Sequence, residues 1–84
     1  ELAVDEIDYI ESDGNYLLFY AGQKTYKLRS TIKGIMTELP ASTFVQTHRA
    51  YIVNKNKVEK STNRCVVIGN KEIAVSEGYR FSKD

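Results

Sequence analysis

Turn signals centred on single glycines separate short strand-like runs, and this spacing limits the fold more than any other feature of the chain. Asp13-Gly14-Asn15, Ala21-Gly22-Gln23 and Gly69-Asn70 each stand between two alternating or apolar runs. Glycine takes positive φ at no steric cost, and tight turns of this kind join antiparallel strands. The pattern therefore predicts hairpins, the first of them formed by IDYIES and DGNYLLFY.

The segment KTYKLR continues the period of two. Thr25, Lys27 and Arg29 share one face of this run, and Tyr26 and Leu28 share the other. Because successive side chains of a strand point to opposite sides, the segment predicts a half-buried strand with a basic outer face.

The segment RSTIKGIMTELP breaks that period. Its apolar residues follow the spacing of an amphipathic helix, at Ile32, Ile35, Met36 and Leu39. Ser30 or Thr31 can cap the start of the helix, and Pro40 stops it. A face that packs on the core is favoured over a face that binds a partner.

Strand-like runs return after Pro40 in TFVQTH, RAYIVN, RCVVI and KEIAVS, with a turn at Asn54-Lys55-Asn56. Ser76 can cap a short helical turn over residues 77–83. The sum is seven or eight short strands and one central helix in a single domain spanning residues 1–84. We therefore expect a mainly β protein, an elongated set of small antiparallel sheets packed together with one short central helix.

The sequence offers little for catalysis or for binding a metal or cofactor. It contains one histidine, His48, and one cysteine, Cys65, which lies in an apolar run typical of a core thiol. A hydrolytic site needs a nucleophile, a base and an orienting group, and structural zinc sites need more cysteine or histidine. No Gly-rich phosphate loop and no membrane-spanning run is present. We therefore expect no enzyme, no metal, no cofactor and no membrane contact.

The charge is unevenly distributed, although the net charge is only +1. Residues 1–13 carry six acidic and no basic side chains, which leaves twelve basic and five acidic side chains in the rest of the chain. Basic and polar residues gather at predicted turns: Asn15-Tyr16, Arg29-Ser30, His48-Arg49, Lys55-Asn56-Lys57 and Tyr79-Arg80. This arrangement favours a polyanionic partner. An alternative for Arg49 is an ion pair with an acidic residue of the first hairpin.

Four segments in this order, DEIDYIESDGNYLLFY, LRSTIKGIMTELP, FVQTHRAYIVNKNKVEK and GNKEIAVSEGY, resemble the LytTR-type DNA-binding domain of bacterial response regulators. The most specific part of the resemblance is an aromatic residue, a His-Arg pair and an Ile-Val-Asn strand end, at Phe44, His48, Arg49, Ile52, Val53 and Asn54. The resemblance implies an elongated β fold that binds successive major grooves through loops.

The resemblance also implies roles for individual residues. The turn at Asn15-Tyr16 matches the first DNA-facing loop, Arg49 matches a position that contacts the backbone, and His48 braces that loop. The last contacting loop follows Val75-Ser76. Family members commonly carry basic residues there, whereas this chain has Glu77-Gly78, so Tyr79 or Arg80 is expected to supply the contact.

The favoured hypothesis is a cytoplasmic, sequence-specific binder of double-stranded DNA, the output domain of a two-component transcription regulator. Its upstream receiver domain would drive dimerisation onto promoters with paired sites. The predicted DNA-binding residues are Asn15, Tyr16, Arg29, His48, Arg49, Lys55, Lys57, Tyr79 and Arg80. The alternative is a small β module that binds protein or peptide along a sheet edge such as KTYKLR.

Overall fold

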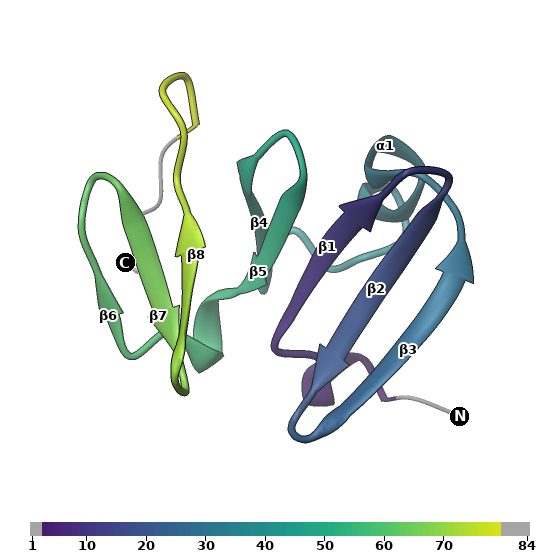
Figure 1. The fold of residues 1–84 in the computed structure, drawn as a ribbon, viewed down its shortest axis with the longest axis horizontal. Coiled ribbons are helices and arrows are strands. Elements are labelled where there is room, and N and C mark those ends of the chain that lie inside the picture. Colours follow the sequence, from purple (N-terminus) through teal and green to yellow (C-terminus); the bar gives the residue numbers. More distant parts are fainter. Residues whose placement is uncertain (1–2, 80–84) are drawn as a thin grey trace.

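The computed structural model describes residues 3–79, which form two antiparallel sheets and one short α-helix (Figure 1). The elements are, in chain order, the 3-10 helix η1 (Val4–Glu6), β1 (Tyr9–Asp13), β2 (Tyr16–Ala21), β3 (Lys24–Arg29), α1 (Ile32–Met36), β4 (Phe44–His48), β5 (Tyr51–Asn54), the 3-10 helix η2 (Lys55–Lys57), β6 (Lys60–Ser61), β7 (Cys65–Ile68) and β8 (Lys71–Ala74). The mainly β prediction is confirmed.

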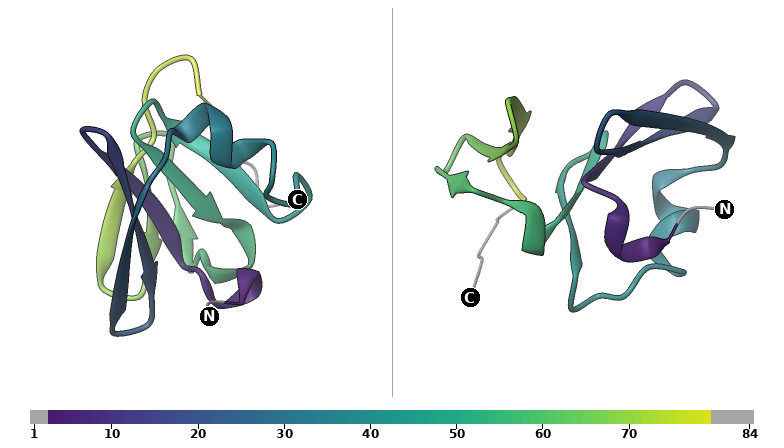
Figure 2. Two further views of the ribbon diagram at one scale, coloured as in Figure 1. Left: turned by 90° about the vertical axis from the view of Figure 1, so that its right-hand side faces the viewer. Right: turned by 90° about the horizontal axis from the view of Figure 1, so that it is seen from below.

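The five-stranded sheet is the middle layer of the domain. Its strand order is β3-β2-β1-β5-β4, and the second sheet has the order β6-β7-β8. Helix α1 lies on one side of the five-stranded sheet and the three-stranded sheet on the other (Figures 1 and 2). The helix therefore covers one face of the middle sheet.

Alternation along the strands divides the core into two clusters. Ile10 of β1 and Ile52 of β5 are fully buried and pack in the cluster that α1 closes with Ile35. The adjacent residues Tyr9 and Val53 point the other way, into a second cluster built with the small sheet. Since neighbouring side chains of a strand lie on opposite faces, each of these strands serves both clusters. The middle sheet thus holds the two outer layers together.

The helix is shorter than its apolar stripe predicts, because it ends at Met36. Thr31 caps its start as expected, its hydroxyl accepting the Gly34 N–H at 3.0 Å. At the other end, the Thr37 hydroxyl donates to the Gly34 carbonyl at 2.7 Å, and the chain continues in turns to Pro40. The stripe still packs on the core, with Ile35 buried and its apolar neighbours partly buried.

Strand β3 corrects the prediction of a half-buried strand. Tyr26 is 40% exposed and Leu28 is 53% exposed, and every residue of β3 is exposed. Tyr26 pairs with Phe19, and Leu28 pairs with Leu17, in the β2–β3 register. Both side chains therefore lie on the sheet face on which α1 packs. A helix of five residues does not reach the edge strand, and this end of the face stays uncovered.

The glycine turns are confirmed, but the C-terminal helical turn is not. Gly14, Gly22 and Gly69 each open a two-residue hairpin turn with φ close to 60°. Residues 77–79 instead form a turn in which the Tyr79 N–H donates to the Ser76 carbonyl at 3.0 Å. Gly78 has a φ of 94°, which a right-handed helix starting at Glu77 does not allow. Residues 80–83 of that prediction lie outside the described part.

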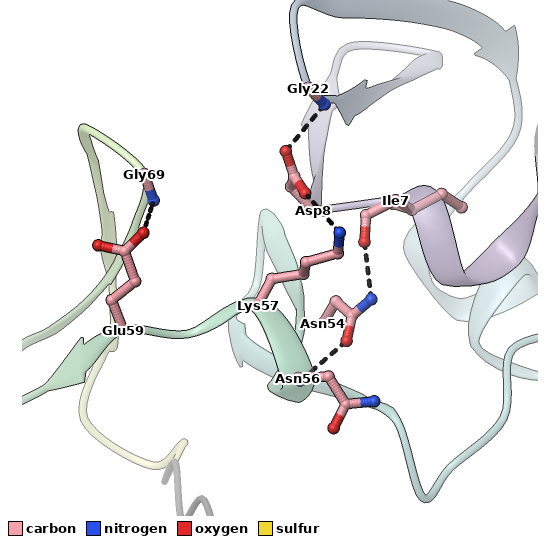
Figure 3. A network of polar contacts seen from close by, with 8 residues as sticks. All are labelled: Ile7, Asp8, Gly22, Asn54, Asn56, Lys57, Glu59 and Gly69. Carbon is pink, nitrogen blue, oxygen red and sulfur yellow. Dashed lines mark hydrogen bonds and ion pairs between the residues drawn. The ribbon is translucent and has the colours of Figure 1, made fainter.

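A buried asparagine at the end of β5 joins the start of the chain to η2. The Asn54 side chain is 1% exposed. Its amide donates to the Ile7 carbonyl at 2.8 Å, and its oxygen accepts the Asn56 N–H at 2.9 Å (Figure 3). A buried amide with both ends bonded fixes the direction of the chain as it leaves the middle sheet.

We predict that Asn54→Ala lowers the free energy of unfolding by about 2–3 kcal/mol, because it leaves the buried Ile7 carbonyl without a donor. Urea unfolding measures this difference. The matched control is Asn56→Ala, since the exposed Asn56 joins the network through its backbone N–H. Equal unfolding free energies of Asn54→Ala and Asn56→Ala would contradict the structural role assigned to the Asn54 side chain.

Candidate nucleic-acid interface

Three of the predicted DNA-facing loops lie at one edge of the domain, the upper edge in Figure 1. They are the β1–β2 turn (residues 14–15), the β4–β5 turn (residues 49–50) and the segment after β8 (residues 75–79). We call this edge the rim. It runs along the longest dimension of the domain, which is 30 Å.

Backbone hydrogen bonds connect neighbouring loops of the rim. The Ser12 N–H donates to the Ala50 carbonyl at 2.8 Å, which joins β1 to the β4–β5 turn. The Ser76 N–H donates to the Thr47 carbonyl at 2.9 Å, and the Thr47 hydroxyl donates to the Ala74 carbonyl at 3.0 Å. Thr47 is fully buried. The spacing of the three loops is therefore set by contacts within the folded chain.

Arg49 occupies the middle of the rim. Its side chain is exposed, in the two-residue turn between β4 and β5. Within residues 3–79 it forms no ion pair, so the pairing with an acidic residue of the first hairpin is not observed. Its guanidinium can present a planar set of donors to an anion outside the chain.

His48 braces the turn that carries Arg49. Its Nδ1 accepts the Ala50 N–H at 3.1 Å, and its carbonyl accepts from the Gln46 side-chain amide at 3.1 Å. The imidazole also packs against Tyr51, with ring centroids 5.4 Å apart. These contacts hold the backbone of the turn that carries Arg49.

The first hairpin brings a second group of predicted residues to the rim. Asn15 is exposed in the turn, and Tyr16 pairs directly with Arg29 across β2 and β3. Lys27, two residues before Arg29 on the same face, holds its ammonium 4.6 Å from the centre of the Tyr16 ring. This cation–π contact keeps a positive charge beside the tip of the hairpin.

A cluster of tyrosines around Glu11 lies in the middle sheet beside the β4–β5 turn. The Tyr20 hydroxyl donates to Glu11 Oε1 at 2.8 Å, and Tyr9 stacks on Tyr20 with ring centroids 4.4 Å apart. Tyr51 reaches the second Glu11 oxygen at 3.5 Å, a weak contact. Burial and the Glu11 carboxylate raise the pKa of Tyr20 to about 12. The raised pKa values of Tyr9, Tyr20 and Tyr51 keep these tyrosines neutral at ordinary pH, and the cluster is a packing unit.

The segment after β8 is the third loop of the rim. Glu77 is exposed and Tyr79 is half-buried. Arg80, the other residue predicted to contact DNA here, lies outside the described residues.

Lys55 and Lys57 are not brought to the rim. They form η2, which lies at the opposite edge of the domain in Figure 1. Lys57 Nζ pairs with Asp8 Oδ1 at 3.8 Å, the one ion pair in the described part of the chain (Figure 3). The two lysines and the rim therefore lie at opposite edges of the domain.

Arg64 is a rim residue that the list of predicted sites lacks. It is exposed in the loop between β6 and β7, which also points toward the upper edge in Figure 1. A sequence signal could have found it. The strand that follows Arg64 pairs with the strand before the last predicted loop, so in an antiparallel sheet the two loops lie at the same end.

Other site types find little support between residues 3 and 79. No three acidic, histidine or cysteine side chains gather there in a way that could hold a metal ion. No helix in this range is long and apolar enough to cross a membrane. Cys65 is half-buried, and its sulfur faces the Thr62 hydroxyl at 3.8 Å.

Comparison with known proteins gives one consistent family. The family model of the LytTr DNA-binding domain matches residues 1–81. The chain is 26% identical over 84 residues to the sensory transduction protein LytT of Enterococcus faecalis, covering 93% of this chain and 35% of that protein. It is 35% identical over 65 residues to an uncharacterized response regulatory protein of Vibrio cholerae, covering 73% of this chain and 25% of that protein.

A solved structure has the same fold. It is the LytTr DNA-binding domain of a Bacillus cereus response regulator, with a TM-score of 0.84 and 21% sequence identity, covering 93% of this chain and 77% of that chain. The chain spans about a third or less of the length of the two relatives above.

We predict that the protein loses stability as the pH rises from 10 to about 12, because Tyr20 holds its proton more tightly when folded than when unfolded. The contribution of Tyr20 is complete below pH 10 and is lost as the pH passes the pKa of the folded state. Urea midpoints across this range should fall less steeply for Tyr20→Phe.

The control for this prediction is Glu11→Gln, followed by tyrosinate absorbance. Removal of the carboxylate should lower the pKa of Tyr20 only in part, since burial is the larger cause. An identical pH dependence of the urea midpoint in wild type and Tyr20→Phe would show that Tyr20 is not the group responsible for the loss of stability.

Proposed function

The chain belongs to the LytTr DNA-binding domain family, and on this premise we propose that it is a sequence-specific binder of double-stranded DNA. The resemblance noted from the sequence is thereby confirmed. Domains of this family serve DNA binding in transcription regulation. The finer steps below are our own proposal for this chain.

The observation that carries the proposal is the rim, in which three exposed loops face one direction along the longest dimension of the domain. That dimension is 30 Å, and one helical turn of B-DNA is about 34 Å long, so the domain can lie along one side of a duplex over nearly a full turn. Strand turns present the contacting groups, and α1 remains a core helix that covers the sheet.

We assign the contacts by the chemistry of each exposed group. Asn15 at the hairpin tip reads base edges, because its amide supplies both a donor and an acceptor. Arg49, Arg29 and Lys27 neutralise phosphates, and His48 positions Arg49. Tyr16 and Tyr79 flank the base-reading positions, and Arg80 follows Tyr79 in the sequence. Lys55 and Lys57 take no part in this contact, since they lie at the opposite edge.

We propose that the chain acts within a longer, cytoplasmic response regulator. Support comes from the two relatives, whose names describe a sensory transduction protein and a response regulatory protein and which are about three to four times longer than the matched region. Phosphorylation of a receiver domain on Asp would bring two such domains onto a promoter with paired sites. The domain itself binds DNA and carries out no reaction.

One observation favours a second candidate function, the binding of a protein segment along β3. A groove of about 350 Å³ lies between β3, η1 and α1, lined by apolar residues that include Val4, Tyr26, Leu28 and Leu39. Its outer strand is an exposed sheet edge. Saturable binding of an extended peptide that Leu28→Lys abolishes, with DNA binding intact, would establish it.

We predict that DNA affinity falls with salt at a slope of about −3 or steeper in a double logarithmic plot, as expected when Arg49, Arg29 and Lys27 each contact a phosphate. Arg49→Ala should weaken binding roughly tenfold at about 0.1 M salt and reduce the slope by about one. The probe is a duplex enriched from a randomised DNA pool by binding to this domain, measured by fluorescence anisotropy.

The matched control is Lys55→Ala, which removes one positive charge at the opposite edge. It should leave both affinity and slope unchanged. A flat salt response of the wild type, or equal effects of the two substitutions, would refute the proposed interface.

A further inference from the structure

A fourth loop reaches the rim beside the segment after β8. The loop joins β6 to β7 and consists of residues 62–64. Ser61 pairs with Val66, and Cys65 pairs with Ala74, so the loop lies at the same end of the small sheet as the exit of β8. Figure 1 shows both at the upper edge.

This loop is held in shape by its own hydrogen bonds. The Thr62 hydroxyl accepts the N–H groups of Arg64 and Cys65, each at 3.1 Å. The Thr62 N–H donates in turn to the Cys65 carbonyl at 2.8 Å. Asn63 and Arg64 are exposed at its outer side. The chain at this point is a fixed turn that presents its side chains outward.

Arg64 is tied directly to the third loop of the rim. Its carbonyl accepts the N–H of Val75 at 2.8 Å, and Val75 is followed by Ser76, which is bonded to Thr47 of β4. The Arg64 backbone, the exit of β8 and the β4–β5 turn are therefore consecutive members of one hydrogen-bonded series.

The charges of the two neighbouring loops complement each other. Between residues 75 and 79 the segment after β8 carries Glu77 and no lysine or arginine. Arg64 is exposed, and among residues 3–79 its guanidinium forms no ion pair. Within residues 3–79, the positive charge at this end of the rim thus comes from the β6–β7 loop.

We propose that the β6–β7 loop is a further DNA-contacting element, in which Arg64 binds a backbone phosphate next to the groove entered by the segment after β8. This inference rests on the proposed function, and it assigns a contact for which neither the sequence motif nor the family match gives a residue. A guanidinium suits this role because its donors can bind a phosphate in pairs.

The first experiment compares Arg64→Ala with Lys71→Ala, using the same enriched duplex. Lys71 is another exposed cation of the same small sheet, next to the β7–β8 turn on the opposite edge. Arg64→Ala should lose roughly tenfold in affinity at about 0.1 M salt and reduce the salt slope by about one, whereas Lys71→Ala should change neither. Equal urea midpoints of the two variants establish that both are folded.

The second experiment locates the phosphate. A series of duplexes each carries one neutral methylphosphonate, and every contacted phosphate costs the wild type affinity when it is neutralised. For Arg64→Ala this cost should vanish at one phosphate and persist at the others, a double-mutant cycle between side chain and phosphate. An unchanged cost at every position would overturn the proposal.

The result also separates this inference from the function on which it rests. If the wild type enriches no duplex and shows no salt-dependent binding, both are overturned. If Arg49→Ala weakens binding and Arg64→Ala does not, the DNA-binding function stands and the contact by the β6–β7 loop is refuted.

Discussion

The buried threonine at the end of β4 is the contact on which the arrangement of this domain depends. Thr47 joins the two sheets through its carbonyl, which accepts from Ser76, and through its hydroxyl, which donates to Ala74. The three-stranded sheet is small, with only two residues in β6, and its position relative to the middle sheet comes from such contacts and from the shared apolar cluster. Without this junction the last loop would have no fixed place beside Arg49.

The features that the sequence predicted correctly are those that local chemistry decides. Gly14 and Gly22 open hairpin turns because positive φ is a property of the residue itself, and Thr31 caps the helix with its own hydroxyl. Burial is decided by distant parts of the chain. The alternating pattern of β3 resembles that of a covered strand, but the helix is too short to reach Tyr26 and Leu28. The sequence therefore predicted the strand and not its exposure.

Distant parts of the chain also decide which of the predicted site residues lie close together. In a run of antiparallel strands, successive turns alternate between the two ends of the sheet. The turns after β1, β4 and β6 and the exit of β8 fall at one end, and the turns after β2, β5 and β7 fall at the other. Lys55 and Lys57 follow β5 and so lie at the other end, away from Arg49. The crossover through α1 interrupts the alternation between β3 and β4, so counting strands from the start of the chain does not assign a turn to its end of the sheet.

The loops of the rim are short and hydrogen-bonded, which explains how a surface proposed to bind DNA can include an acidic residue. Since each loop of the rim is fixed by hydrogen bonds, binding orders little chain and the position of each charge is set before contact. A carboxylate at Glu77 repels phosphates, but it can accept from the amino group of cytosine inside the major groove. In the proposed interface the segment after β8 faces base edges, and its neighbours in the hydrogen-bonded series, Arg64 on one side and Arg49 on the other, face the phosphates. A net charge of +1 is no obstacle to such binding, because the charges nearest to the DNA contribute most to the field that it meets.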